Sequence, residues 1–213
     1  MVIHPNGGGG LMDKAEQLTE TFRYVSAIYR TCATMLESAD VPLLDLGYSP
    51  YDKWHAIWPK RSTSPEDHAQ WLPTFVLRQY HRAGRTDKEA LTIGAALWGY
   101  GSRQRELKQA LCIASYMELQ TGGPDDLYRW GLVQRWTEPI NADGIPRILS
   151  TEDIRFEGGE EQAFLDEVVN GQVLSAAVRL PTVTTTSELM ALVKPVIAEI
   201  PRLGGEDDVP PSG

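Results

Sequence analysis

The chain has 213 residues, of which 42% are hydrophobic and 23% charged, a balance that is ordinary for a globular protein with a hydrophobic core. No apolar run approaches the roughly 18 residues that a membrane-spanning helix needs. The net charge of −9 argues against direct binding to nucleic acids and to acidic membrane surfaces, and it permits a basic protein partner.

The chain divides near Thr137 into two chemically different parts. Residues 1–137 hold all six Trp and all eight Tyr, and their fifteen acidic and fifteen basic side chains cancel. Residues 138–213 hold neither aromatic type and carry fourteen acidic against five basic side chains, so the whole net charge lies there. The first part has the large amphipathic residues that build cores and recognition surfaces, whereas the second presents a negative field.

This division predicts four regions. The glycine run from Gly7 to Gly10 indicates a flexible leader, and the acidic, Pro-rich end of the chain is typical of disorder. The expected regions are a leader at 1–10, a helical, aromatic-rich core at 11–137, an acidic segment at 138–203 that packs on this core, and a disordered tail at 204–213.

The first predicted helix has the clearest pattern. Its apolar residues recur at steps of three and four, which makes one broad stripe along a helix. Val41-Pro42 is expected to end it, because the residue before a proline avoids helical geometry. Phe22 and Ile28 lie centrally on the stripe and are expected to be buried. The stripe consists of Leu11, Ala15, Leu18, Phe22, Val25, Ile28, Cys32 and Leu36.

Residues 43–63 are expected to form an irregular loop that is rich in aromatic residues, with a short strand at 53–58 as an option. Four helices are predicted after it, at about 65–82, 86–98, 103–120 and 125–136. Ser64, Ser102 and the capping-box pattern Thr86-Asp87-Lys88-Glu89 indicate helix starts, and Gly84 indicates a helix end. The expected fold is therefore mainly α, a compact bundle of antiparallel helices with an irregular aromatic loop and an acidic C-terminal segment.

The competing interpretation is an α+β fold with a central antiparallel meander. Leu91, Ile93, Ala95 and Leu97 alternate in the sequence as the residues of a strand do. Helix and strand both stay open for 86–120 and for 172–186. A last helix at about 188–200 is expected to begin after Ser187 and to be disturbed by Pro195.

The favoured function is that of a non-enzymatic protein-binding module, such as an inhibitor or immunity-type protein, that acts through an aromatic or acidic surface. Trp54 and Trp58 are candidates because Trp is enriched at binding hot spots, although core packing is the simpler explanation for an aromatic cluster. Glu157, Glu160 and Glu161 are candidates because they concentrate negative charge, although solubility alone would also explain them.

The alternative function is an enzyme or small-ligand sensor with a pocket for an anionic ligand between the central helices. Arginine side chains bind anions through charge-assisted hydrogen bonds, and aromatic rings bind cationic groups through cation–π contacts. Solvated helix faces are the simpler explanation for the same charges. The residues expected to line such a pocket are Trp71, Arg78, Tyr80, His81, Arg82, Trp98 and Arg103.

No catalytic, metal or cofactor motif rises above background, so no metal ion and no cofactor is expected. His55, His68 and His81 are thirteen residues apart, whereas helical metal-binding histidines are three or four apart. Cys32 and Cys112 lie among apolar neighbours and are expected to be buried, reduced thiols, which indicates a cytoplasmic protein. The pattern leaves the oligomeric state open.

Overall fold

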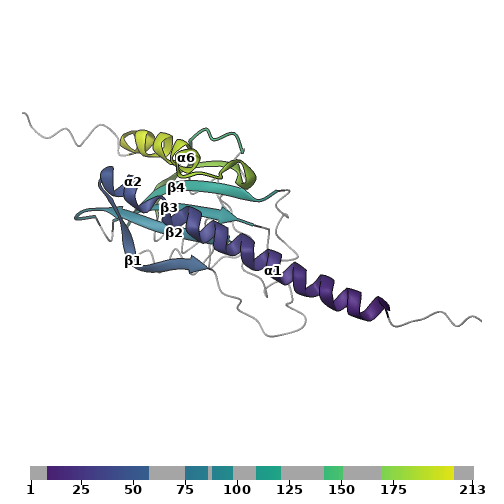
Figure 1. Cartoon of the computed structure of the whole chain (residues 1–213). Helices are drawn as coiled ribbons and strands as arrows, with labels where there is room; N and C mark the ends of the chain where they lie inside the picture. The colour runs from purple at the N-terminus through teal and green to yellow at the C-terminus, as the bar shows by residue number, and fades with distance from the viewer. Residues whose placement is uncertain are drawn as a thin grey trace, which may run out of the picture.

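The computed structural model describes residues 9–57, 75–85, 88–97, 109–120, 142–150 and 169–203. Within these ranges the chain forms a six-stranded antiparallel sheet with helices packed on one face (Figure 1). The predicted compact bundle of antiparallel helices is therefore wrong. The alternative, an antiparallel meander combined with helices, is closer to the structure.

The sheet has the strand order β1-β2-β3-β4-β6-β5, and each neighbouring pair is antiparallel. The first four strands follow one another as a meander, and β6 then pairs with β4. Strands from both sides of Thr137 thus share one sheet. The strands are β1 Tyr48–Ile57, β2 Phe75–Arg82, β3 Glu89–Ala96, β4 Leu111–Leu119, β5 Arg147–Ser150 and β6 Val169–Arg179.

Within the described part of the chain, three helices cover one face of this sheet. The C-terminal half of α1 lies over β2 and β3, α2 lies against β1, and α6 lies over β4 and β6 (Figure 1). The first and last helices are confirmed as elements, although α1 ends before Val41-Pro42, which falls within α2. The helices are α1 Gly9–Glu37, α2 Asp40–Asp45 and α6 Thr186–Glu199, and short 3-10 turns span Leu180–Thr182 and Ile200–Arg202.

The start of α6 shows how local chemistry sets a helix boundary. The Thr185 hydroxyl accepts a hydrogen bond from the Glu188 backbone N–H at 3.2 Å, and the Glu188 carboxylate accepts one from the Thr185 N–H at 3.0 Å. This reciprocal capping box replaces the cap predicted at Ser187. Pro195 was expected to disturb the helix, but the helix continues through it to Glu199. The buried face of α6 consists of Leu189, Met190, Leu192, Val193 and Val196.

The helices predicted at 86–98 and 103–120 are wrong because β3 and β4 are buried on both faces. Leu91, Ile93 and Ala95 belong to the core under the helices. The residues between them, which face the other side of the sheet, are buried as well. A strand with no solvent face shows only a weak alternation of polar and apolar residues, so the alternation of Leu91, Ile93 and Ala95 does not exclude a helix. The predicted helix at 65–82 also fails over its second half, where the chain forms β2.

Four polar side chains form a buried row on the other face of the sheet. Register places Gln79 opposite Thr92, Thr92 opposite Ser115, and Ser115 opposite Ser175. All four are buried, and the Ser115 and Ser175 hydroxyls hydrogen-bond to each other. Directly opposed residues share a face, so these side chains satisfy one another across strands. The row is a structural reason for polar residues in otherwise apolar strands.

Candidate functional site

A buried carboxylate lies at the end of the sheet where β2 turns into β3. Glu89, the first residue of β3, has an exposed fraction of 0%. The Arg82 backbone N–H donates to Glu89 Oε1 at 2.7 Å, and Arg82 Nε donates to both carboxylate oxygens at 3.0 Å. The Tyr116 hydroxyl donates to Oε2 at 2.9 Å. The buried charge is thereby surrounded by donors, as buried carboxylates must be.

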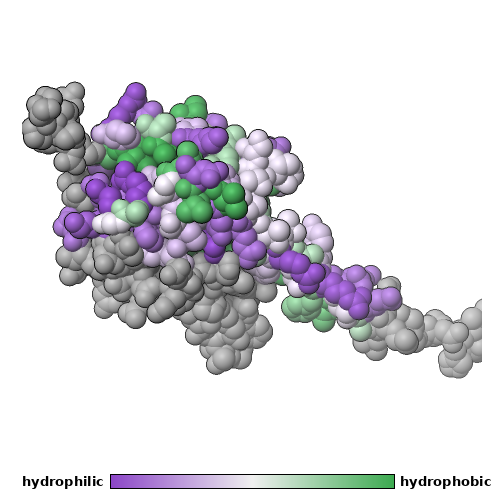
Figure 2. Space-filling model, turned by 60° about the vertical axis from the view of Figure 1, so that its left-hand side comes forward, coloured by the Kyte–Doolittle hydropathy of each residue, from purple (hydrophilic) through white to green (hydrophobic). Residues whose placement is uncertain are grey.

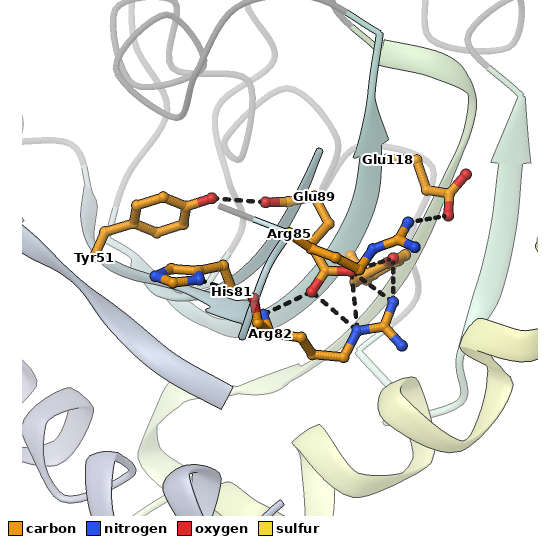
Figure 3. Close-up of polar contacts among 7 residues, drawn as sticks. Tyr51, His81, Arg82, Arg85, Glu89 and Glu118 are labelled. Atoms are coloured by element: carbon orange, nitrogen blue, oxygen red, sulfur yellow. Dashed lines mark hydrogen bonds and ion pairs between the residues drawn. The ribbon is translucent and has the colours of Figure 1, made fainter. Parts of the chain in front are cut away.

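Arg85 and Glu118 complete this polar cluster, which Figure 3 shows. Arg85 Nε lies 3.0 Å from Glu89 Oε2 but makes no aligned hydrogen bond, so their contact is electrostatic. Arg85 Nη2 donates to Glu118 Oε1 at 3.2 Å. Gly84, with φ of 78°, lies in the turn between the strands, where a left-handed conformation favours glycine. Two carboxylates and two guanidiniums leave the cluster with no net formal charge.

The pKa values of Glu89, Tyr116 and Arg82 are shifted away from neutral pH. Burial by itself would raise the pKa of Glu89, but hydrogen bonds from Arg82 and Tyr116 outweigh it and lower that pKa. Burial and the Glu89 carboxylate raise the pKa of Tyr116, and the hydrogen bond to Glu89 raises the pKa of Arg82. General acid–base catalysis requires a pKa close to the working pH. The cluster is therefore suited to joining β2, β3 and β4 rather than to transferring protons.

Tyr51 and His81 lie beside the cluster (Figure 3). The Tyr51 hydroxyl donates to the Glu89 backbone carbonyl at 2.9 Å, and its ring centroid lies 4.4 Å from that of His81. His81 Nδ1 lies 3.0 Å from the Arg82 carbonyl oxygen, to which the Nδ1–H tautomer donates. The only predicted pocket residues in this group are therefore His81 and Arg82, and both have partners within the sheet.

Arg78 and Tyr80 link the sheet to the junction of α1 and α2. Arg78 Nε and Nη2 donate to the two Asp40 carboxylate oxygens at 2.6 Å each. The Tyr80 hydroxyl lies 2.9 Å from Asp40 Oδ1 and 3.2 Å from the Leu36 carbonyl oxygen. Burial and the Asp40 carboxylate raise the pKa of Tyr80. Both predicted pocket residues thus serve to attach the end of α1 to β2.

The helices that were expected to enclose the predicted ligand pocket are strands in the structure. Arg78, Tyr80 and Arg82 alternate with His81 along β2 and so face the opposite side of the sheet from it. The remaining candidates for that pocket, Trp71, Trp98 and Arg103, lie outside the described residues.

The candidates for an aromatic or acidic surface are placed only in part. Trp54 lies in β1, an edge strand of the sheet, and the structure describes its backbone alone. Trp58, Glu157, Glu160 and Glu161 lie outside the described residues. Their roles in binding stay predictions.

An exposed apolar stripe on α1 is a candidate site that the sequence analysis missed. Every described side chain from 14 to 24 is exposed, and this projecting half of α1, residues 9–24, extends past the strands (Figure 1). Leu18 is 59% exposed and Phe22 61%. The prediction that Phe22 is buried is wrong, whereas Ile28 is partly buried against the core. Figure 2 shows hydrophobic residues along one side of this helix and hydrophilic residues along another.

A surface groove of about 610 Å³ runs beside the stripe. It combines an aromatic ring and small side chains with two guanidinium groups, so it suits an apolar segment that carries carboxylates. The groove is lined by Thr19, Phe22, Arg23, Ser26, Ala27 and Arg30. The sequence contained a signal for this surface, namely the length of the apolar stripe. A stripe along a 29-residue helix is longer than the sheet that covers it, so one end of the stripe stays uncovered.

The cysteines are free and buried, as predicted. Burial raises the pKa of Cys112 to about 12 and also raises the pKa of Cys32, so both thiols are protonated at neutral pH and are weak nucleophiles. Among the described residues, no group of three or more His, Cys, Asp or Glu side chains has the arrangement of a metal site. None of the described helices is both long and apolar enough to cross a membrane.

Comparisons with family models, with curated proteins and with solved structures found no match for this chain.

Proposed function

We propose that this chain is a non-enzymatic protein-binding module that recognises its partner through the projecting half of α1. The observation that supports this most is the exposed, aligned pair Leu18 and Phe22 on a helix that extends beyond its own sheet. Single exposed apolar residues are common on protein surfaces. A contiguous stripe on a projecting helix is instead a known mode of partner recognition, in which the helix lays its apolar face into a groove or against another helix.

The energetics of the helix agree with this proposal. Helices of about 12–15 residues without tertiary packing are marginal in water. The projecting half has no acidic residue in its first turn to offset the helix dipole, and its Glu20–Arg23 ion pair is exposed. Burying Leu18 and Phe22 against a partner would contribute about 1–2 kcal/mol each, since more than half of each side chain is free to be covered. A partner therefore supplies the packing that this half lacks.

The acidic C-terminal part supports the proposal through charge. Its excess of nine negative charges favours a basic partner surface and fast association. Replacing Glu157, Glu160 and Glu161 with Gln together should lower the association rate at low salt, and the effect should fade as salt rises. An association rate that is unchanged across a salt series would leave solubility as the role of these carboxylates.

The proposal is tested by capturing partners from an extract of the source cells with three forms of the full chain. The double variant Leu18→Ser, Phe22→Ser should retain far less bound protein than the wild type. Tyr24→Ser is the matched control: Tyr24 is 69% exposed and lies about 200° round the helix from Phe22. It should bind as the wild type does.

Circular dichroism and urea unfolding should show that all three forms fold alike, because the changed residues are exposed. Equal capture by the wild type and the double variant would reject the projecting half of α1 as the binding surface.

A further inference from the structure

We propose that the projecting half of α1 is a helix–coil switch. In the free chain this half exchanges between helix and unfolded backbone, and the partner binds the helical form and completes the helix. The inference rests on the proposed function and describes how the affinity of that binding site is set. It is carried by the packing of α1, by its sequence and by two side-chain hydrogen bonds along it.

The core holds α1 at its C-terminal half. There Cys32 and Leu36 are buried, and Ile28 and Tyr29 pack against the core. Every described side chain from 14 to 24 is exposed instead, on the part of the helix that extends past the strands (Figure 1). A helix grows from a nucleus that is costly to form, and the packed half provides this nucleus. The projecting half therefore depends on propagation of the helix toward the N-terminus.

This propagation must pass a weak segment, residues 19–24. Its sequence is Thr-Glu-Thr-Phe-Arg-Tyr, and the two threonines and two aromatic residues are among the types with low helix propensity. Residues 9–18 lie beyond the weak segment. Once detached from the nucleus, they are shorter than the roughly 12–15 residues that an isolated helix needs in water. Unfolding of the weak segment thus releases the whole projecting half.

Two side-chain hydrogen bonds destabilise the helix in the same place. The Thr19 hydroxyl donates to the Ala15 carbonyl oxygen at 2.9 Å, and the Thr21 hydroxyl donates to the Gln17 carbonyl oxygen at 2.8 Å. A hydroxyl that bonds to the carbonyl four residues earlier competes with the backbone N–H for that oxygen and slightly destabilises the helix. The ion pair between residues 20 and 23 is exposed and therefore contributes little.

The apolar surface of the proposed binding site depends on this equilibrium. Phe22 lies inside the weak segment and Leu18 directly before it, so the two side chains align only when the segment is helical. The apparent dissociation constant is that of the helical form divided by the fraction of chains that adopt it. A substitution that raises helix propensity in the weak segment should therefore tighten binding even where it touches no partner.

The first experiment measures amide hydrogen exchange in the free, full chain. Thr19→Ala with Thr21→Ala should raise the protection factors of residues 14–20 by roughly fivefold, because alanine has the higher helix propensity. Thr31→Ala with Thr34→Ala is the matched control, since these two threonines are also exposed but lie in the half that the core holds. The control should leave protection at 14–20 unchanged.

Two results of this experiment would overturn the switch. One is protection at residues 14–20 of the wild type that equals protection at 30–37. The other is protection at 14–20 that does not respond to the change at Thr19 and Thr21, because a helix that is already complete gains nothing from higher propensity.

The second experiment tests the coupling to binding at Tyr24, which is 69% exposed and faces away from Phe22. Its probe is the protein that the wild-type chain captures from an extract of the source cells. Tyr24→Ser should bind this protein as the wild type does, because serine and tyrosine have similar helix propensities. Tyr24→Ala should bind more tightly and Tyr24→Gly more weakly, with dissociation constants that differ by up to about fivefold. Equal affinities of the Ala and Gly variants would show that binding is not coupled to helix formation.

Failure of this inference is distinguishable from failure of the proposed function. The exchange experiment needs no partner, so it decides whether the projecting half unfolds even if the partner binds elsewhere. A fully protected helix whose partner capture still depends on Leu18 and Phe22 would reject the switch alone.

Discussion

The two halves of α1 carry one apolar stripe and place it in opposite environments. In the packed half, residues 25–37, Cys32 is 4% exposed and Leu36 2%, and both belong to the core between the helices and the sheet. In the projecting half, Leu18 and Phe22 are 59% and 61% exposed. The comparison teaches that helical periodicity identifies which face of a helix is apolar, whereas the length of the covering sheet decides how much of that face is buried.

The packed half also has a polar attachment that the projecting half lacks. Asp40, just beyond α1, accepts hydrogen bonds from Arg78, and Tyr80 lies within hydrogen-bonding distance of both Asp40 and the Leu36 carbonyl oxygen. Apolar packing and charge-assisted hydrogen bonds thus act at the same end of the helix. We expect substitutions in the two halves to differ most where these contacts are concentrated.

The largest expected difference is between Leu36→Ala and Leu18→Ala. Leu36 is buried in a packed core, so its truncation should cost about 2–5 kcal/mol of unfolding free energy. Leu18 is exposed, so its truncation should change the unfolding free energy of the monomer by less than about 0.5 kcal/mol. Urea unfolding of dilute protein measures both. Similar losses for the two variants would contradict the division of α1 into halves.

A smaller loss is expected when the attachment is removed by Asp40→Asn. The Arg78 side chain is 10% exposed and would lose its counter-charge, whereas Asp40 is 33% exposed and partly screened by water. The expected cost is about 1–3 kcal/mol, the scale of hydrogen bonds to charged groups. Asp143→Asn is a control that removes the exposed pair with Arg147 and should have little effect on thermal unfolding. Equal effects of the two variants would mean that the Arg78 pair adds nothing to the attachment.

The pH dependence of stability should report on the sheet that supports the packed half. Burial opposes ionisation of Glu89, yet its hydrogen bonds from Arg82 and Tyr116 lower its pKa below the ordinary value. The unfolded chain therefore binds this proton more readily, so the stabilisation is present above the ordinary pKa of about 4.3 and is lost as pH falls through the lowered value. Glu89→Gln should flatten the acid limb of unfolding free energy against pH. An acid limb as steep as that of the wild type would show that other carboxylates carry it.

The smallest expected effect is the difference between the two halves of α1 in the cost of an Ala→Gly substitution, which lowers helix propensity. Ala33→Gly in the packed half should cost about 1 kcal/mol of global unfolding free energy. Ala15→Gly should cost less, because local unfolding of a weakly packed helix end does not require the core to open. Hydrogen exchange should agree, with amides of residues 14–24 exchanging faster than those of 30–37 in dilute protein. Uniform protection along α1 in a monomer would contradict the comparison.

Part of the fold could be predicted from the sequence because some signals are local. The stripe from Leu18 to Leu36 predicts α1, and the apolar spacing from Leu189 to Val196 predicts α6. The burial of Cys32 and Cys112 follows from their apolar neighbours. In each case, residues within two or three helical turns determine the outcome, so no distant partner has to be known.

The strands and the candidate sites depended on partners far away in the chain. Glu89 matches a capping box in the sequence, but in the structure it opens β3 and binds Arg82 and Tyr116, the latter 27 residues away. Arg78 suits an anion site in the sequence, but Asp40, 38 residues away, occupies its guanidinium. Such contacts produce no periodic pattern in the sequence, so the sequence is equally consistent with a ligand-binding role for the same residues.

The sequence by itself determined the two terminal helices and the apolar character of the segments between them, because hydrophobicity and capping act over a few neighbouring residues. Only the tertiary structure decided between helix and strand for 89–96 and 111–119, since nearly all of their residues are buried, on both faces of the sheet, and the weak alternation that is left does not exclude a helix. It also decided that Phe22 is exposed while Leu36 is buried. The physical reason is that a residue is buried only where a second surface covers it. A sequence pattern identifies the apolar surface but not the surface that covers it.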